Sequence, residues 1–523
     1  MNVAVAEARA SNALEIEMAE RLALAAVLIV YAVWIVAFGW PRDVLGYGTE
    51  TDFIGGFVVE AQSFIAGQPL QSTFHPPLYP MLLGAVYDLT GDWFRAGLII
   101  SFVSGAVVLV ASWLLVRALY GRICGFGALV GLAAAPAFLA YAISATSDVP
   151  FLALLLAASA AAVLAAQRQD WGAAGIAGVL AALTLLTRTN GVTLMLLGAL
   201  PLLGVGPWSA RLRSVGAFAV GAAAPILAMA VFAAVTGSSV VPAGTVDNLA
   251  MTLYADGDRQ SGDALRQVVG QFDSLGDVIA HDPVRVAAVY LRDLWRLAIA
   301  GIPALLGKPL TLLAVPGLVW LLSRRTGLLG AGVLVVFGAQ LALLNLKQFE
   351  PRFYIYLTPL LGAGLAATFL LAFHLARGRA HVALTGIAVA ATGLAVVNSV
   401  RLANGSVERD AAEVESFLAA GLQRHVPTGA LVVARKPHLA FYAHASGTTI
   451  PATDDLARLR VALSELDHPG EVLVFFGEVE ARTRPELGAL RDPERAPAWL
   501  EPIATSLPAG GWTLYRLRHE RTD

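Results

Sequence analysis

Long apolar runs of close to twenty residues recur through the first four hundred positions of the chain. A run of this length allows a helix to cross a hydrocarbon core of about 30 Å. The runs expected to span the membrane lie near 21–40, 93–116, 123–142, 149–166, 172–187, 190–206, 214–236, 303–323, 327–346, 353–374 and 381–400. The pattern therefore predicts an all-α polytopic membrane domain with about eleven transmembrane helices.

Two further apolar segments, 76–91 and 286–302, are short or interrupted by charged residues. Between Tyr290 and Arg296, aromatic and charged side chains are mixed within one helical pattern. This composition is typical of a helix that lies at the membrane surface. We therefore expect both segments to form interfacial helices rather than spans.

Composition agrees with a membrane protein, because 57% of the 523 residues are hydrophobic and only 14% are charged. A soluble protein of this size would carry roughly a quarter charged residues. The net charge is −2, which gives no indication of nucleic-acid binding. The composition thus excludes a soluble class and leaves the function to individual polar residues.

Basic residues indicate the orientation of the chain, because loops on the cytoplasmic side carry an excess of Lys and Arg. They fall in alternate loops, at Arg117, Arg122, Arg168, Arg211, Arg213, Arg324, Arg325, Arg377 and Arg379. We therefore expect a cytoplasmic N-terminus. The loops 41–92, 143–148 and 237–302 and the tail after residue 400 should then face outward.

The tail changes in composition and periodicity. The stretches "GALVVAR", "GEVLVFFGE" and "GWTLYRLR" are typical of short buried strands, separated by helical or loop segments. We therefore predict two domains, a transmembrane domain at 1–401 and a small extracytoplasmic α/β domain at 402–523.

Asp52 lies in the first outward loop, directly before a helical pattern of apolar residues. The apolar positions recur at three- and four-residue spacings, at Phe53, Phe57, Ala61, Phe64 and Ile65. An aspartate at such a helix start either caps the helix or takes part in chemistry, and the two roles are compatible. Glu50 and Glu60 are interpreted as solvated loop and helix-face residues.

Asp148 lies between two spans, with few polar residues around it. A charged group this close to hydrocarbon needs water, a partner or a function. Pro150 suits the first turn of the next helix, so Asp148 or Ser147 could also be its cap. Two acids on one membrane side could activate an acceptor hydroxyl or bind one divalent cation; we assign no metal and no other cofactor.

Three cations are expected on the same outward side as the two acids: Arg188, Lys347 and Arg352. Each could be an interfacial anchor whose stem lies along apolar surface. Together they could also hold a phosphate or pyrophosphate. His75 precedes Pro76-Pro77, which favours an extended lead-in to a helix, so a structural role is the simpler interpretation of this histidine.

Several of these segments, in this order, resemble one family of membrane enzymes. The segments are "FHPPLYPMLLG", "SATSDVPFLALLL", "LTRTNG", "FEPRFYIYLTPLLG" and, in the tail, "VVARKPHLAFYAHASG". They are similar to segments of the GT-C class of integral membrane glycosyltransferases. The similarity is to bacterial members of the branch that contains protein O-mannosyltransferases and the lipid A aminoarabinose transferase.

The resemblance implies transfer of a sugar from a polyprenyl-phosphate donor, on the outer face of a bacterial cytoplasmic membrane and with inversion. Asp52 takes the place of the catalytic acid of the first loop, and Asp148 that of the second-loop acid. The resemblance also places Arg352, and with it Lys347 and Arg188, at the lipid phosphate.

His75 and Tyr354 lie in the matched segments, so we expect them at the substrate-binding site. One departure concerns Glu50. The eukaryotic protein O-mannosyltransferases have adjacent Asp-Glu in the first loop, whereas here the order is Glu50-Thr-Asp52. No role is therefore carried over to Glu50.

Two other classes of function remain open at this point. A transporter or flippase of lipid-linked sugars would share the size and topology, but it should place ionisable groups deep within its spans. A different transferase, such as an oligosaccharide ligase, is the second alternative. The acceptor could be a lipid, a glycan or a protein hydroxyl, and the sugar is not specified by the sequence.

Overall fold

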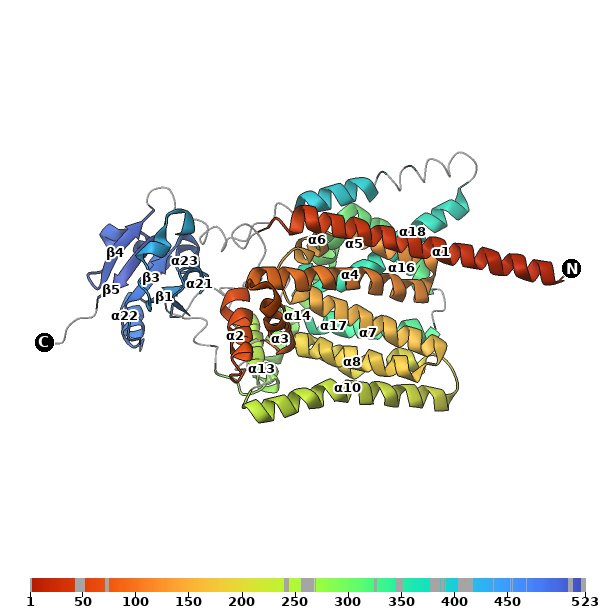
Figure 1. Ribbon diagram of the computed structural model, residues 1–523, viewed down its shortest axis with the longest axis horizontal. Coiled ribbons are helices and arrows are strands. Elements are labelled where there is room, and N and C mark those ends of the chain that lie inside the picture. Colours follow the sequence, from red (N-terminus) through yellow and green to blue (C-terminus); the bar gives the residue numbers. More distant parts are fainter. Residues whose placement is uncertain are drawn as a thin grey trace.

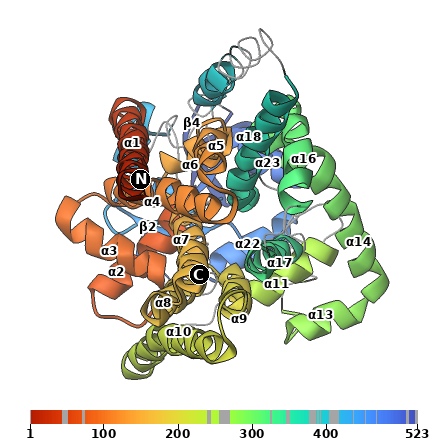
Figure 2. The same ribbon diagram turned by 90° about the vertical axis from the view of Figure 1, so that its right-hand side faces the viewer.

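The computed structural model describes residues 2–42, 52–70, 75–238, 244–254, 268, 270–323, 327–344, 351–376, 386, 390, 392–402, 417–435, 437–451, 453, 455–466, 468–506 and 511–518. Figure 1 shows a bundle of long helices and, beyond one of its ends, a small sheet with short helices. In the view along the bundle, the long helices lie side by side (Figure 2).

The helical part begins with α1 (Asn2–Trp34), α2 (Val59–Ile65), α3 (Leu78–Thr90), α4 (Trp93–Tyr120), α5 (Arg122–Ala133), α6 (Pro136–Ala142), α7 (Asp148–Arg168), α8 (Trp171–Thr187) and α9 (Val192–Leu197). It continues with α10 (Trp208–Thr236), α11 (Gly244–Tyr254), α13 (Leu275–His281), α14 (Pro283–Arg296), α15 (Ile302–Leu306), α16 (Lys308–Ser323), α17 (Gly327–Leu344) and α18 (Thr358–Leu375). Between them lie the π-helical turns η1 (Ile35–Gly39), η2 (Phe53–Val58) and η5 (Leu297–Gly301) and the 3-10 turns η3 (Thr189–Gly191), η4 (Leu200–Leu203) and η6 (Pro351–Leu357).

The second part, which we call the C-terminal sheet region (417–518), has one five-stranded sheet. Its elements are η7 (Leu422–His425), β1 (Leu431–Ala434), α21 (His438–Tyr442), β2 (Ser446–Thr449), α22 (Leu456–Ser464), β3 (Val472–Phe476), α23 (Glu478–Thr483), η8 (Pro485–Arg491), η9 (Pro493–Arg495), β4 (Leu500–Thr505) and β5 (Thr513–Leu517). The strand order is β2-β1-β3-β5-β4. β1 pairs in parallel with β2 and β3, whereas β5 is antiparallel to β3 and β4.

The apolar helices confirm a multi-pass helical membrane domain followed by a small α/β region. Among the described residues, five helices are long and apolar enough to cross a membrane, and the number reaches seven if each of two bent helix pairs is one span. Shorter apolar helices lie at Phe53–Ile65, Trp171–Thr187, Thr189–Leu203 and Leu329–Leu344. The expected eleven spans stay a prediction, as does the boundary at 401/402, which adjoins residues outside the description.

Two predicted continuous spans are broken. The run 123–142 forms α5 and α6, which are bent by 70°. Pro136 opens α6 and holds Ala135 in an extended conformation, so the helix cannot continue through this point. The run 190–206 forms η3, α9 and η4 in succession, interrupted near Gly198 and Pro201. Both predicted spans are therefore bent or segmented, and whether each crosses the membrane as one span stays a prediction.

The segment predicted to lie at the membrane interface forms α14 and η5. The helical stretch that contains them, Pro283–Leu306, is bent by 102° against Lys308–Ser323. Gly307, at a φ of 81°, makes this corner, which suits a residue without a Cβ. A right-angled turn between α14 and the apolar helix α16 fits a surface helix that leads into a span. The other predicted interfacial segment, 76–91, forms α3.

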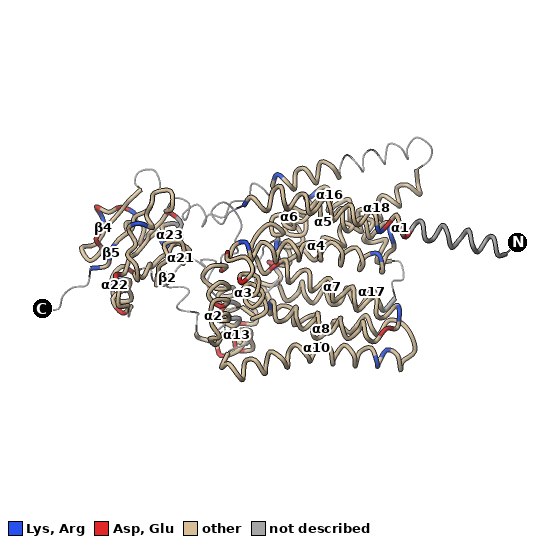
Figure 3. The backbone as a smooth tube through the Cα atoms, viewed as in Figure 1, with Lys and Arg blue, Asp and Glu red and all other residues tan. Residues whose placement is uncertain are grey.

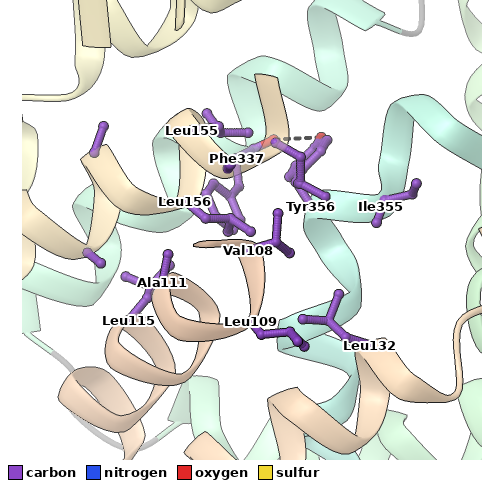
Figure 4. Close-up of a cluster of buried hydrophobic side chains, with 14 of the residues drawn as sticks. Val108, Leu109, Ala111, Leu115, Leu132, Leu155, Leu156, Phe337, Ile355 and Tyr356 are labelled. Carbon is purple, nitrogen blue, oxygen red and sulfur yellow. Dashed lines mark hydrogen bonds between the residues drawn. The ribbon is translucent and has the colours of Figure 1, made fainter. Parts of the chain in front are cut away.

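The core of the bundle packs around α4, α7 and η6. Figure 4 shows Leu155 and Leu156 of α7 close to Phe337 and to Tyr356 of η6. The Tyr356 hydroxyl donates a hydrogen bond to the carbonyl of Phe337 at 3.2 Å. Glycines let α5 and α18 approach closely, since a Cβ at Gly131 would lie 2.8 Å from the Gly362 Cα. The Tyr356 hydrogen bond holds η6 against α17.

Charged residues lie mainly at the ends of the long helices rather than midway along them (Figure 3). At one end, Glu20 of α1 contacts both Arg117 and Arg122. The side-chain amide of Gln167 donates to the carbonyl of Ala118 at 2.8 Å, which brings the end of α7 to the same place. The other end of α7 begins at Asp148 and carries the predicted site.

Candidate active site

Asp52 occupies the position directly before the turn η2. The amides of Gly56 and Phe57 donate to its backbone carbonyl at 2.9 and 3.1 Å. Its side chain makes no capping hydrogen bond, and 48% of it is exposed. The predicted helix after Asp52 thus forms as η2 and α2, whereas capping does not account for the Asp52 carboxylate.

His75 lies between two carboxylates of this segment. Its Nε2 atom is 3.8 Å from Asp52 Oδ2, and its Nδ1 atom is 3.8 Å from Glu60 Oε1. The imidazole packs on the Phe57 ring, with centroids 4.1 Å apart. Gly56 makes room for it, because a Cβ there would lie 3.1 Å from His75 Cε1. We call Asp52, Glu60 and His75 the carboxylate–histidine group.

Glu60 was interpreted from the sequence as a solvated helix-face residue, and this was wrong. Only 12% of its side chain is exposed, because the chain that enters α3 folds back over α2 at His75. Helical periodicity describes one helix at a time and does not show which loop covers its polar face. One signal was available in the sequence. Gly56 and Glu60 are four residues apart, so on a helix the acid and the space beside a glycine lie on the same face.

Asp148 is the first residue of α7, and only 6% of its side chain is exposed. Its Oδ1 atom lies 2.6 Å from Arg188 Nη1, and its Oδ2 atom lies 3.7 Å from Arg352 Nη1. The Thr146 hydroxyl donates to Oδ2 at 3.1 Å, and Arg188 also donates to the Ser147 hydroxyl at 2.8 Å. Asp148 is therefore a buried counter-ion of two arginines rather than a cap that faces water.

An aromatic ring links the two arginines. The guanidinium carbons of Arg188 and Arg352 lie 5.4 and 4.9 Å from the centre of the Phe353 ring. Arg352 also lies 6.0 Å from the Tyr141 ring. Two guanidinium groups around one ring present a set of N–H donors that suits a bound phosphate. Sequence reasoning passed over Phe353, although an aromatic directly after an arginine is a recognisable stacking pair.

The remaining predicted site residues differ in their position. Tyr354 is 1% exposed and belongs to the hydrophobic core of the bundle, and its place at the substrate-binding site stays a prediction. Lys347 and Glu50 lie outside the described residues. Of the predicted set, the structure thus brings together Asp52 with His75, and Asp148 with Arg188 and Arg352.

The loops that carry the two acids meet on α4. A Cβ at Gly97 of α4 would lie 2.7 Å from Ala145 Cβ and 2.9 Å from Phe53 Cε2. Phe53 follows Asp52 directly, and Ala145 lies just before the turn that leads to Asp148. The two loops are therefore neighbours, and the carboxylate–histidine group shares one end of the bundle with Arg188 and Arg352, which we call the arginine pair.

Within the described part of the chain, no group of three or more His, Cys, Asp and Glu side chains is arranged to hold a metal ion. The charged side chains at this end form two separate groups. Carboxylates and an imidazole stand in one group, and two guanidinium groups around an aromatic ring stand in the other.

A family model described as dolichyl-phosphate-mannose-protein mannosyltransferase matches residues 74–235. The match includes His75, Asp148 and Arg188. No curated protein matches the chain by sequence. The fold is similar to that of ArnT from Cupriavidus metallidurans bound to undecaprenyl phosphate, at 13% identity and a TM-score of 0.54, over 95% of this chain and 97% of that chain. The resemblance to the GT-C class is confirmed.

Two other solved structures are similar at a lower score. The apo form of the same ArnT aligns at 14% identity and a TM-score of 0.49, over 96% of this chain and 98% of that chain. An oligosaccharyltransferase from Archaeoglobus fulgidus aligns at 13% identity and a TM-score of 0.49, over 86% of this chain and 67% of that chain. Of these three structures, the undecaprenyl-phosphate-bound ArnT has the highest TM-score, 0.54.

Proposed function

We propose that this GT-C-like chain is a glycosyltransferase that moves a sugar from a polyprenyl-phosphate donor to an acceptor hydroxyl, with inversion, on the outer face of a bacterial cytoplasmic membrane. The proposal is supported by the family match, by the fold shared with ArnT and by the residues at one end of the bundle. The observation that carries it is that Asp52 and the arginine pair stand in separate groups at that end. The arginine pair suits a phosphate, whereas Asp52 suits a neutral hydroxyl.

In the proposed reaction, the acceptor oxygen attacks the anomeric carbon while Asp52 takes the proton from the acceptor hydroxyl. The bond between the anomeric carbon and the phosphate oxygen breaks, and the lipid phosphate leaves with the electron pair. Attack from the face opposite the leaving phosphate inverts the configuration. His75 lies between the Asp52 and Glu60 carboxylates, 3.8 Å from each.

The arginine pair acts on the leaving group. Arg188 and Arg352 lie around one ring and face one carboxylate, so their guanidinium groups are held in place before the donor binds. Fixed positive groups stabilise the charge that develops on the phosphate oxygen as the bond breaks. Asp148 takes a positioning role in this proposal, because a buried ion-paired carboxylate cannot readily accept a proton from an acceptor.

The positions of the charges favour transfer over transport. Asp148 opens α7, Arg188 directly follows α8, and Arg352 precedes α18. A transporter is expected to place such groups near the middle of the bilayer, where interrupted helices meet. Here they stand at helix ends, where a lipid phosphate lies.

The experiment compares wild-type protein with Asp52→Asn in membranes supplied with radiolabelled polyprenyl-phosphate sugars. Loss of the proton acceptor should reduce transfer by roughly 100- to 10,000-fold. Asp88→Asn, an exposed acid on the neighbouring helix α3, is the matched control and should keep full transfer. Wild-type turnover in Asp52→Asn would remove Asp52 from the mechanism, and movement of intact donor without transfer would favour a flippase.

A further inference from the structure

The C-terminal sheet region contacts the turn that carries Asp52. Pro437 precedes α21, and its ring lies against Gly55 of η2. A Cβ at Gly55 would lie 2.9 Å from Pro437 Cδ and closer still to its Cγ. Cβ atoms do not approach other heavy atoms this closely, so any larger residue at position 55 would displace the Pro437 ring.

Pro437 is held from its other side by its own sheet. A Cβ at Gly447 of β2 would lie 3.1 Å from Pro437 Cβ and 2.6 Å from Ala440 Cβ. Glycines on two different regions of the chain therefore leave room for one proline ring. Because the ring is rigid and lies between η2 and β2, a shift of the sheet would be transmitted to η2.

Apolar side chains of α21 extend this contact. Phe441 and Tyr442 pack against the buried cluster that contains Phe53 and Ile54 of η2. Those two residues follow Asp52 directly and are 1% and 3% exposed. The turn that presents Asp52 is thus packed on the bundle on one side and on the C-terminal sheet region on the other.

The turn η2 needs such support. It is a π-helical turn, a form that is uncommon and that occurs frequently at functional sites. It also contains the adjacent pair Gly55 and Gly56, and glycine loses more conformational freedom on ordering than any other residue. Packing from both sides can hold this turn in one conformation.

From these contacts we infer that the C-terminal sheet region, through Pro437 and α21, is a positioning element that fixes η2 and the direction of Asp52. The inference rests on the proposed function for its catalytic consequence. The region would then act on the rate of transfer rather than on binding of the lipid phosphate, which the arginine pair carries out elsewhere.

A compensating pair of substitutions tests this inference in the full-length protein. Gly55→Ala introduces the overlap with Pro437, and Pro437→Ala removes the Cγ and Cδ atoms that cause it. The remaining distance from a Cβ at position 55 to Pro437 Cβ is 3.8 Å, an ordinary contact. The double variant should therefore restore what Gly55→Ala alone destroys. Gly216→Ala, with nothing within 4 Å of the added Cβ, is the matched control.

Two readouts separate this inference from the proposed function. In Gly55→Ala, amide exchange of η2 and α21 should rise about tenfold, and kcat should fall roughly 10- to 100-fold with KM for the donor unchanged. Both should return in the double variant, and neither should change in Gly216→Ala. Unchanged exchange of η2 in Gly55→Ala would overturn the inference, with or without transfer activity. Raised exchange with unchanged kcat would overturn the positioning role alone, and absence of transfer in the wild type would contradict only the proposed function.

Discussion

Two buried acids in this chain, Asp148 and Glu20, each face two arginines. Their side chains are 6% and 7% exposed, respectively. Asp148 opens α7, whereas Glu20 lies at the end of the bundle where α7 finishes beside α4. A helix of the length of α7 spans roughly 30 Å, which is about the distance between the two groups. The same residue types, one acid and two arginines, therefore occur at both ends of the bundle.

The group at Glu20, which we call the α1 cluster (Glu20, Arg117 and Arg122), has two short ion pairs. Arg117 donates a hydrogen bond to the Glu20 carboxylate at 2.9 Å, and Arg122 forms an ion pair with it at 2.8 Å. Arg117 also covers the Trp113 ring, at 5.2 Å from its centre. The two ion pairs join α1 to α4 and to α5. The α1 cluster therefore fastens a helix that otherwise has much of its surface exposed.

The two ion pairs of the group at Asp148 differ in length. Arg188 lies 2.6 Å from the carboxylate, but Arg352 stands at 3.7 Å, and both guanidinium groups face the Phe353 ring. Arg352 is therefore the more distant of the two arginines from the Asp148 carboxylate. The structural ion pairs at Glu20 and the candidate phosphate site at Asp148 contain the same residue types. They differ in the distance of the second arginine from the carboxylate and in the aromatic ring that both arginines of the Asp148 group face.

The largest effect that tests this comparison is expected for Asp148→Asn. It leaves two largely buried arginines facing a neutral amide, and loss of one partner of a buried ion pair typically costs about 3–5 kcal/mol of stability. Misplaced guanidinium groups should reduce transfer by roughly 100- to 1,000-fold. Initial rates with labelled donor, measured beside Asp148→Glu to retain the charge, check this. A wild-type rate in Asp148→Asn would show that the arginine pair needs no counter-ion.

A smaller effect is expected for Phe353→Leu. Leucine keeps apolar volume but removes the ring that both guanidinium groups face, and each such contact contributes about 0.5–2 kcal/mol. We expect KM for the donor to rise about tenfold, with kcat changed less. Phe126→Leu, beside Trp113 and near the α1 cluster, is the matched control and should leave KM unchanged. An equal rise in both variants would indicate a general packing defect instead.

Much of the candidate site could be predicted from the sequence, because polar residues beside long apolar runs are few. Asp52, Asp148, Arg188 and Arg352 all stand out in this way. Their pairing could not be predicted, since Asp148 and Arg352 are separated by two hundred residues and meet only when η6 packs on α7. The membrane class followed from the apolar runs. The bend at Pro136 was missed, because hydropathy is averaged over a window and does not register the missing backbone N–H of one proline.

The contact between Gly55 and Pro437 lies further beyond sequence reasoning. Glycine at position 55 could serve a turn, a close approach or neither, and its partner lies in another region of the chain. The burial of Glu60 could not be predicted for a related reason, because the loop that covers Glu60 lies outside its own helix. Periodicity thus predicts which face of an element is apolar, whereas the identity of the covering element depends on the assembled fold.

The smallest effect on transfer is expected for Glu20→Gln. Glutamine keeps the shape of the side chain but removes the charge that Arg117 and Arg122 face, so α1 should be held less firmly. These arginines are 32% and 46% exposed, and water will compensate them in part. The temperature of unfolding in detergent should fall by about 2–4 °C, while transfer stays within about twofold of wild type, since the site lies roughly 30 Å away. Glu17→Gln, from an exposed pair with Arg21, should change neither quantity. A loss of transfer in Glu20→Gln comparable with that in Asp148→Asn would mean that the two ends are coupled through α4 and α7, and the distinction between a structural and a functional cluster would then fail.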